Sequence, residues 1–67
     1  MGKHRGEPKV VWRVHYLESE RGWGQDRWHV DYDTEQEALE KYDESQPKPG
    51  PTPDYYIIAT KWEIVTL

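Results

Sequence analysis

The residues best suited to chemistry are histidines and carboxylates that alternate along one short segment. His29, Asp31 and Asp33 stand at every second position, and His15 lies in a similar segment earlier in the chain. Imidazole and carboxylate groups together suit several divalent metal ions and could also act as an acid–base pair. The same residues form an ordinary solvated polar face if Arg side chains lie opposite the histidines, which is the interpretation we favour.

The sequence lacks the residues that other kinds of enzyme chemistry usually need. The chain has no cysteine, only two serines, and no glycine-rich phosphate-binding motif. Nucleophilic catalysis and nucleotide binding therefore have little support. We predict a non-enzymatic protein without catalytic residues, metal or cofactor, and keep a small metal-dependent enzyme as an alternative.

The composition indicates one small domain with a thin core. The chain has 67 residues, of which 34% are hydrophobic and 33% charged, and its aromatic residues are all Trp or Tyr. A domain of this size buries only about 60% of the surface that its unfolded chain exposes. Without disulfides, we expect stabilisation by bulky aromatic side chains in the core or by self-association as a homodimer.

The charge pattern bears on partners and location. The net charge is −4, but residues 1–30 carry six basic and four acidic residues, whereas residues 31–67 carry three and nine. Such a balance argues against general nucleic-acid binding. The sequence has no cysteine, no apolar run long enough to span a membrane, and no apolar stretch after its basic start. These features predict a cytoplasmic protein that does not contact membranes.

Alternating apolar residues predict a β-hairpin at the start of the domain. Residues 1–8 are expected to be a flexible tail, followed by strands over residues 9–17 and 25–32 with a glycine-containing turn over 18–24. Placing Val14 opposite Trp28 brings the large apolar residues of both strands onto one face. In that register Arg13 faces His29 and His15 faces Arg27.

The second half of the chain predicts a helix, a proline-rich loop and a strand. Thr34 and Glu37 have the spacing of a capping box, so a helix should begin there and end near Ser45, ahead of the proline-rich loop 46–54. Pro stands at every second position in that loop, which favours an extended spacer. A last strand is expected over residues 55–65.

The predicted fold class is therefore α+β, a single β-β-α-β domain over residues 9–67. We expect a three-stranded, mainly antiparallel sheet with one helix packed on one face. A helical crossover would make the first strand central and give the order 2-1-3, which we favour because the first and third strands are apolar on both faces. A loop of this length also permits a 1-2-3 meander.

Periodicity divides the nine aromatic residues into two groups. Seven are expected to pack between the sheet and the helix: Trp12, Tyr16, Trp28, Tyr32, Tyr42, Tyr56 and Trp62. Trp23 and Tyr55 are left over. Trp23 stands between two glycines in a charged turn, where it could anchor a partner or fold back over the end of the hairpin.

We predict a protein-binding surface at this turn and on the uncovered face of the sheet. The turn contributes Arg21 and Trp23. An apolar patch is expected on the face opposite the helix, formed by Leu17, Tyr55, Ile57 and Val65. The predicted partner is a protein of unknown identity, or a second copy of the chain.

Two alternatives use charged surfaces instead. Basic residues of the sheet could bind single-stranded nucleic acid, with Trp23 or Tyr55 as stacking platforms; they are Arg13, Arg27, His29 and Lys61. Acidic residues between Asp31 and Glu44 could instead imitate the phosphates of DNA and inhibit a DNA-binding enzyme.

Several short strings resemble small bacteriophage-encoded proteins of unassigned activity. They are Trp12-Arg13-Val14-His15-Tyr16, Arg21-Gly22-Trp23-Gly24, Trp28, Asp33-Thr34 and Pro53-Asp54-Tyr55-Tyr56-Ile57. The resemblance covers roughly residues 10–58. It implies an accessory protein that binds a host protein, and it implies no site residues.

Overall fold

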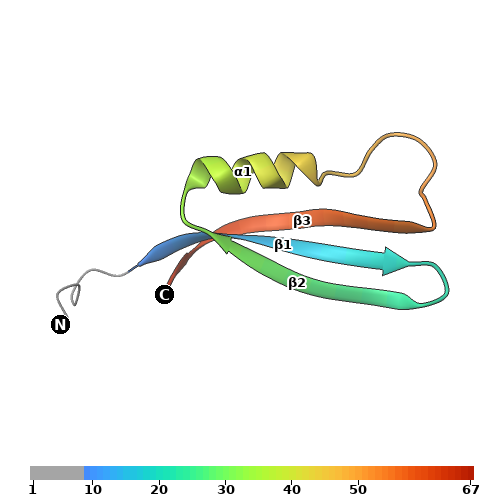
Figure 1. Cartoon of the computed structure of the whole chain (residues 1–67), viewed down its shortest axis with the longest axis horizontal. Coiled ribbons are helices and arrows are strands. Elements are labelled where there is room, and N and C mark those ends of the chain that lie inside the picture. Colours follow the sequence, from blue (N-terminus) through green and yellow to red (C-terminus); the bar gives the residue numbers. More distant parts are fainter. Residues whose placement is uncertain (1–8) are drawn as a thin grey trace.

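A computed structural model describes residues 9–67 as a three-stranded sheet with one helix (Figure 1). The elements are β1 (Val10–Glu20), β2 (Gly24–Tyr32), α1 (Glu35–Glu44) and β3 (Tyr55–Thr66). The sheet order is β2-β1-β3, and β1 is antiparallel to both neighbours. The α+β class, the β-β-α-β order and the central first strand are confirmed, and the 1-2-3 meander is wrong. The predicted tail, residues 1–8, lies outside the described residues.

The hairpin between β1 and β2 is longer than predicted. β1 continues to Glu20, so the turn is confined to Arg21, Gly22 and Trp23. Gly22 and Gly24 have φ angles of 85° and 103°, a region that residues with a Cβ rarely adopt. These two glycines allow the chain to reverse in three residues.

The hairpin register differs from the predicted one by two residues. Val14 lies opposite Val30 rather than Trp28, and Trp28 lies opposite Tyr16. A shift of two residues leaves every side chain on its predicted face, because side chains alternate with a period of two. The assignment of faces was therefore right for both strands, whereas the predicted cross-strand pairs were wrong.

The helix begins and ends where the sequence predicted. Thr34 is the N-cap, and its hydroxyl accepts a hydrogen bond from the Glu37 amide at 3.2 Å. At the other end, the carbonyl of Ser45 accepts a hydrogen bond of 2.8 Å from the Ala59 amide, which fastens the helix end to β3. No helix in the described part of the chain is long and apolar enough to cross a membrane.

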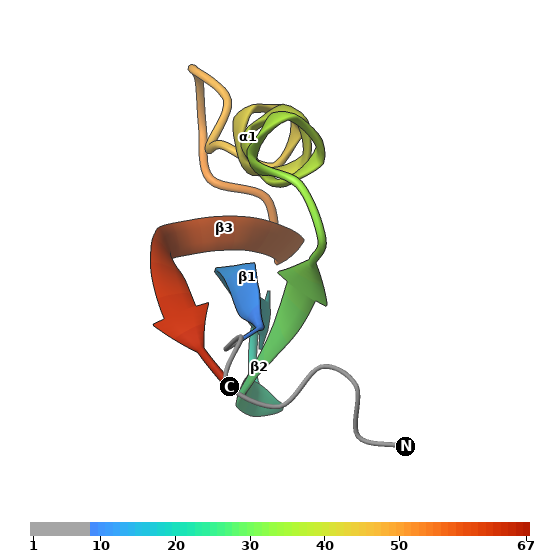
Figure 2. The same ribbon diagram turned by 90° about the vertical axis from the view of Figure 1, so that its left-hand side faces the viewer.

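The core lies between α1 and the middle of the sheet (Figure 2). Val14 and Ala38 are fully buried, Ala59 and Tyr16 nearly so, and three half-buried aromatic residues surround them: Trp12, Tyr32 and Tyr42. The hydroxyls of Tyr16 and Tyr32 share a hydrogen bond of 3.0 Å. The pKa of Tyr16 is raised, mainly because its hydroxyl is buried and secondly because of this hydrogen bond. Four of the seven predicted core aromatics therefore pack as expected.

A β-bulge in β3 explains why Tyr56, one of the three remaining aromatics, departs from prediction. The β1–β3 register shifts between His15 and Tyr16, so that Thr60 is the extra residue. Beyond this bulge the two faces of β3 exchange, which moves Tyr56 to the face opposite the helix and Ile57 to the helix face. Trp28 and Trp62 keep the predicted face but lie at the margin of the helix, each more than one-third exposed.

Candidate functional site

Trp23 lies in the turn between β1 and β2, at the end of the hairpin that is far from Leu67 and the start of β1 (Figure 1). Its side chain is 83% exposed, the highest value among the large hydrophobic residues of the described chain. Its backbone amide donates to the Glu20 carbonyl at 2.9 Å, so the turn is ordered although the side chain is free. The structure thus excludes the prediction that Trp23 folds back over the hairpin.

The turn is held in place by the segment that precedes β3. The Arg21 amide donates to the Asp54 carbonyl at 2.8 Å, and the Arg21 guanidinium lies 3.0 Å from an Asp54 carboxylate oxygen. These two contacts join residues that are 33 positions apart in the sequence. We call the surface formed by Arg21, Trp23, Tyr55 and Ile57 the tip.

Tyr55 and Ile57 lie on the helix face of β3, beyond the end of α1. They are 50% and 44% exposed. The Tyr55 hydroxyl donates to a carboxylate oxygen of Glu18 at 2.6 Å, which raises the pKa of Tyr55. The predicted placement of both residues on the uncovered face was wrong, because the bulge at Thr60 exchanges the faces.

Leu17 does not belong to this surface. It lies on the face opposite the helix, as predicted, but it is 8% exposed and pairs with Ile58 across the sheet. The predicted patch of Leu17, Tyr55, Ile57 and Val65 is therefore not formed, because only Leu17 and Val65 lie on that face. The structure instead brings Tyr55 and Ile57 to the same end of the molecule as Arg21 and Trp23.

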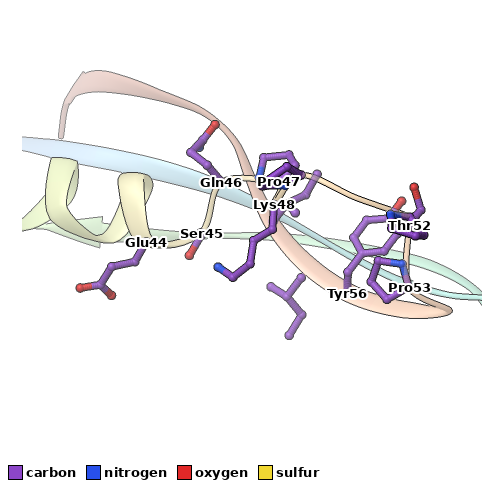
Figure 3. Close-up of a pocket in the computed structure, with 12 residues that line it drawn as sticks. Glu44, Ser45, Gln46, Pro47, Lys48, Thr52, Pro53 and Tyr56 are labelled. Carbon is purple, nitrogen blue, oxygen red and sulfur yellow. The ribbon is translucent and has the colours of Figure 1, made fainter.

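A groove runs beside the tip, between the proline-rich loop and β3 (Figure 3). Its volume is about 610 Å³, and Pro47, Pro53, Tyr56 and Ile57 are among its lining residues. A second hollow of about 400 Å³ shares Pro53 and Tyr56 with the groove and extends to Arg21. The sequence prediction missed Tyr56 and Pro53 as surface residues because it placed Tyr56 in the core and treated the loop as a spacer.

The polar face opposite the helix is held by ion pairs. Arg13 donates to both carboxylate oxygens of Asp31, at 2.8 and 3.0 Å, and His15 donates to Glu63. The Arg13 hydrogen bond lowers the pKa of Asp31, and the His15 hydrogen bond lowers that of Glu63. Arg13 therefore lies opposite Asp31 and not opposite His29 as predicted. Because its guanidinium is already paired with the Asp31 carboxylate, Arg13 is poorly suited to bind a nucleic-acid phosphate.

The other residues predicted to bind nucleic acid lie close together on this face. Arg27, His29 and Lys61 line a shallow hollow of about 270 Å³ together with His15. The His15 and His29 rings are 5.8 Å apart, with the two residues directly opposite each other. Neither predicted stacking platform lies here, because Tyr55 is on the other face and Trp23 is in the turn.

Within residues 9–67, no three His, Asp or Glu side chains are arranged to hold a metal ion. His29 faces His15, Asp31 is paired with Arg13, and Asp33 lies 3.4 Å from the ammonium of Lys9. The alternating residues His29, Asp31 and Asp33 thus contact three different partners.

Comparisons with known proteins supply no relative. No protein-family model, no curated protein and no solved structure matches this chain.

Proposed function

We propose that this protein is a non-enzymatic protein-interaction module that binds its partner through the tip. The observation that carries the proposal is Trp23, a side chain 83% exposed on a turn that is itself fixed by hydrogen bonds. Large aromatic residues that become buried on association supply much of the binding energy of protein interfaces. Trp23 is the anchor in this proposal.

The contacts that fix the turn support the proposed role of Trp23, because they lower the free-energy cost of binding. Ordering a flexible loop on binding costs free energy that is subtracted from the affinity. Here the two Arg21–Asp54 contacts fix the turn before any partner arrives. The groove beside the tip offers an apolar continuation of the contact, since Ile57 belongs to both.

The partner is a protein, and the resemblance to phage-encoded proteins suggests a protein of the bacterial host. The test is photo-crosslinking in host lysate, with a photoreactive phenylalanine analogue at position 23 and mass spectrometry of the adducts. The same analogue at position 36, on the exposed side of α1, is the matched control. A nuclease-treated sample separates protein adducts from complexes that nucleic acid bridges.

The expected result is one dominant protein adduct at position 23 that is absent at position 36 and survives nuclease. Affinity for that protein should fall on Trp23→Ala and be largely kept on Trp23→Phe, because the phenyl ring retains most of the aromatic contact. Equal capture by Trp23→Ala and the unaltered chain would contradict the proposal.

A second candidate, binding of single-stranded nucleic acid, rests on the hollow lined by Arg27, His29 and Lys61. Arg27 and Lys61 have no carboxylate within ion-pair distance in residues 9–67. Phosphate contacts release counterions, so binding must weaken as salt rises. An oligonucleotide mobility shift that disappears in Arg27→Gln and weakens with salt would favour this function over the first.

A further inference from the structure

The outer edge of β2 is unpaired along the whole strand in the described chain. β2 forms one margin of the sheet, and none of its outward amides or carbonyls has a backbone partner within residues 9–67 (Figure 1). Eight of its nine residues are exposed. A strand with these properties is a template for pairing with another strand.

The other edge of the sheet, formed by β3, does make hydrogen bonds. The outer edge of β3 is bonded at Ala59, whose amide donates to Ser45 and whose carbonyl accepts from the Gln46 side chain at 3.3 Å. The proline-rich loop also forms the other wall of the groove that runs along the first half of β3. Within residues 9–67, only β2 therefore has an outer edge without backbone hydrogen bonds along its whole length.

We infer that β2 pairs with β2 of a second copy, antiparallel and centred on His29, to give a six-stranded sheet in a homodimer. In this register Arg27 of each copy lies opposite Asp31 of the other, and Trp28 lies opposite Val30. Each type of pair occurs twice because the contact is symmetric. Both opposite-charge pairs and aromatic pairs with β-branched residues stabilise antiparallel strands.

The charge pattern selects this register. Within one copy, Glu63, Arg13 and Asp31 form a row of alternating charge across β3, β1 and β2. Arg27 of the second copy extends that row by one more positive charge. Within residues 9–67 of one copy, Arg27 has no carboxylate partner, so the dimer supplies the missing one.

The apolar pattern agrees with the same register. Trp28 and Val30 lie on the helix face and are 38% and 37% exposed, beyond the cover that α1 provides. Pairing centred on His29 buries each of them against the other. Pairing centred on Trp28 would instead oppose Arg27 to His29, and pairing centred on Val30 would oppose Arg27 to Asp33, which lies beyond the end of β2.

Single cysteines test both the dimer and its register, because the chain contains no cysteine of its own. In the inferred dimer the two copies of position 29 are directly opposite, and such Cα atoms lie about 4.5–5.5 Å apart, within reach of a disulfide. Gln25→Cys is the matched control on the same strand and face. Lys61→Cys reports pairing through β3.

Under mild oxidation, His29→Cys should form a disulfide-linked dimer about tenfold faster than Gln25→Cys or Lys61→Cys, because only position 29 faces itself across the two-fold axis. Sedimentation equilibrium of the unaltered chain should show a concentration-dependent dimer. Arg27→Glu should raise its dissociation constant about tenfold, since two opposite-charge pairs become like-charge contacts. Arg27→Lys should leave it nearly unchanged.

Two outcomes would overturn the inference. A chain that stays monomeric up to its solubility limit would mean that the charges of β2 block edge pairing. A dimer that cross-links equally well through position 25 or 61 would mean that the copies associate by another surface. Because Trp23 is not altered in these variants, either failure leaves the tip proposal intact.

Discussion

The part of the sheet beneath α1 and the tip differ in how far their side chains are buried and in the kind of contact that holds them. Beneath the helix, Val14 and Ala38 are fully buried, and the aromatic side chains pack against them. At the tip, Trp23 and Tyr55 expose most or half of their surface, and the contacts are hydrogen bonds rather than apolar packing. Buried apolar packing is therefore concentrated beneath the helix, and the large exposed side chains on which the proposed function rests lie at the tip.

This separation means that the two regions should respond differently to mutation. Substitutions beneath the helix should change the free energy of unfolding. Substitutions at the tip should leave that free energy nearly constant and change association. Four measurements, in order of decreasing effect on stability, test this division.

The largest effect is expected for Ala38→Asp. Ala38 is fully buried against the sheet, so the new carboxylate would lose its hydration without gaining a partner, at a cost of about 3–5 kcal/mol. A single core in a domain this small rarely supplies more than about 3–5 kcal/mol, so the variant should be largely unfolded. Far-UV circular dichroism measures this, with Gln36→Asp on the exposed side of α1 as the control. A folded Ala38→Asp chain would show that α1 does not seal the core.

A smaller loss is expected for Thr34→Ala. The Thr34 hydroxyl accepts the Glu37 amide at the start of α1, and removal of such a cap costs about 0.5–2 kcal/mol. Urea denaturation should show a lower midpoint with an unchanged slope. Thr52→Ala, in the exposed proline-rich loop, is the matched control and should leave the midpoint in place. Equal midpoints for the two variants would contradict the role of the cap.

The ion pairs on the polar face should make the free energy of unfolding depend on pH in the acidic range. The pKa values of Asp31 and Glu63 are lowered from their ordinary values of 3.8 and 4.5 by hydrogen bonds from Arg13 and His15. A lowered pKa stabilises the fold above the ordinary value, and that stabilisation is lost as pH falls through the value in the folded state.

The measurement is the unfolding free energy between neutral pH and about pH 2. Asp31→Asn should lose less stability on acidification than the unaltered chain, because one of the two carboxylates no longer titrates. Arg13→Gln should reduce the loss in the same way, since it removes the hydrogen bond that lowers the pKa of Asp31. If both variants keep the original pH dependence, these ion pairs do not contribute to it.

The smallest effect on stability is expected for Trp23→Ala. Because the side chain is 83% exposed, its removal should change the unfolding free energy by no more than about 0.5 kcal/mol. Chemical denaturation of the variant and the unaltered chain measures this. A loss of several kcal/mol would show that Trp23 supports the fold, and the contrast between the two regions would fail.

The general architecture could be predicted because local signals agreed with one another. The capping residues at Thr34, the two-residue alternation in β1 and β2, and the apolar character of β1 and β3 on both faces all favoured one topology. The polar turn with two glycines indicated the position of Trp23. These signals are local, and each specifies one element.

What could not be predicted depends on contacts between distant segments. The hairpin register was wrong by two residues because a two-residue shift preserves both faces and hence the apolar pattern. The bulge at Thr60 has no signal in the sequence, and it exchanged the predicted positions of Tyr56 and Ile57. The Arg21–Asp54 contact joins segments that only the closed sheet brings together.

The position of the two chain ends has a practical consequence. The Leu67 amide donates to the Lys9 carbonyl at 2.8 Å, so the start and end of the described chain lie side by side, at the opposite end of the sheet from Trp23. A purification tag, a fluorophore or a sensor surface attached through position 67 would therefore leave the tip facing solution. Protein immobilised through position 67 would therefore expose Trp23 to a partner in solution, which suits measurements of binding affinity.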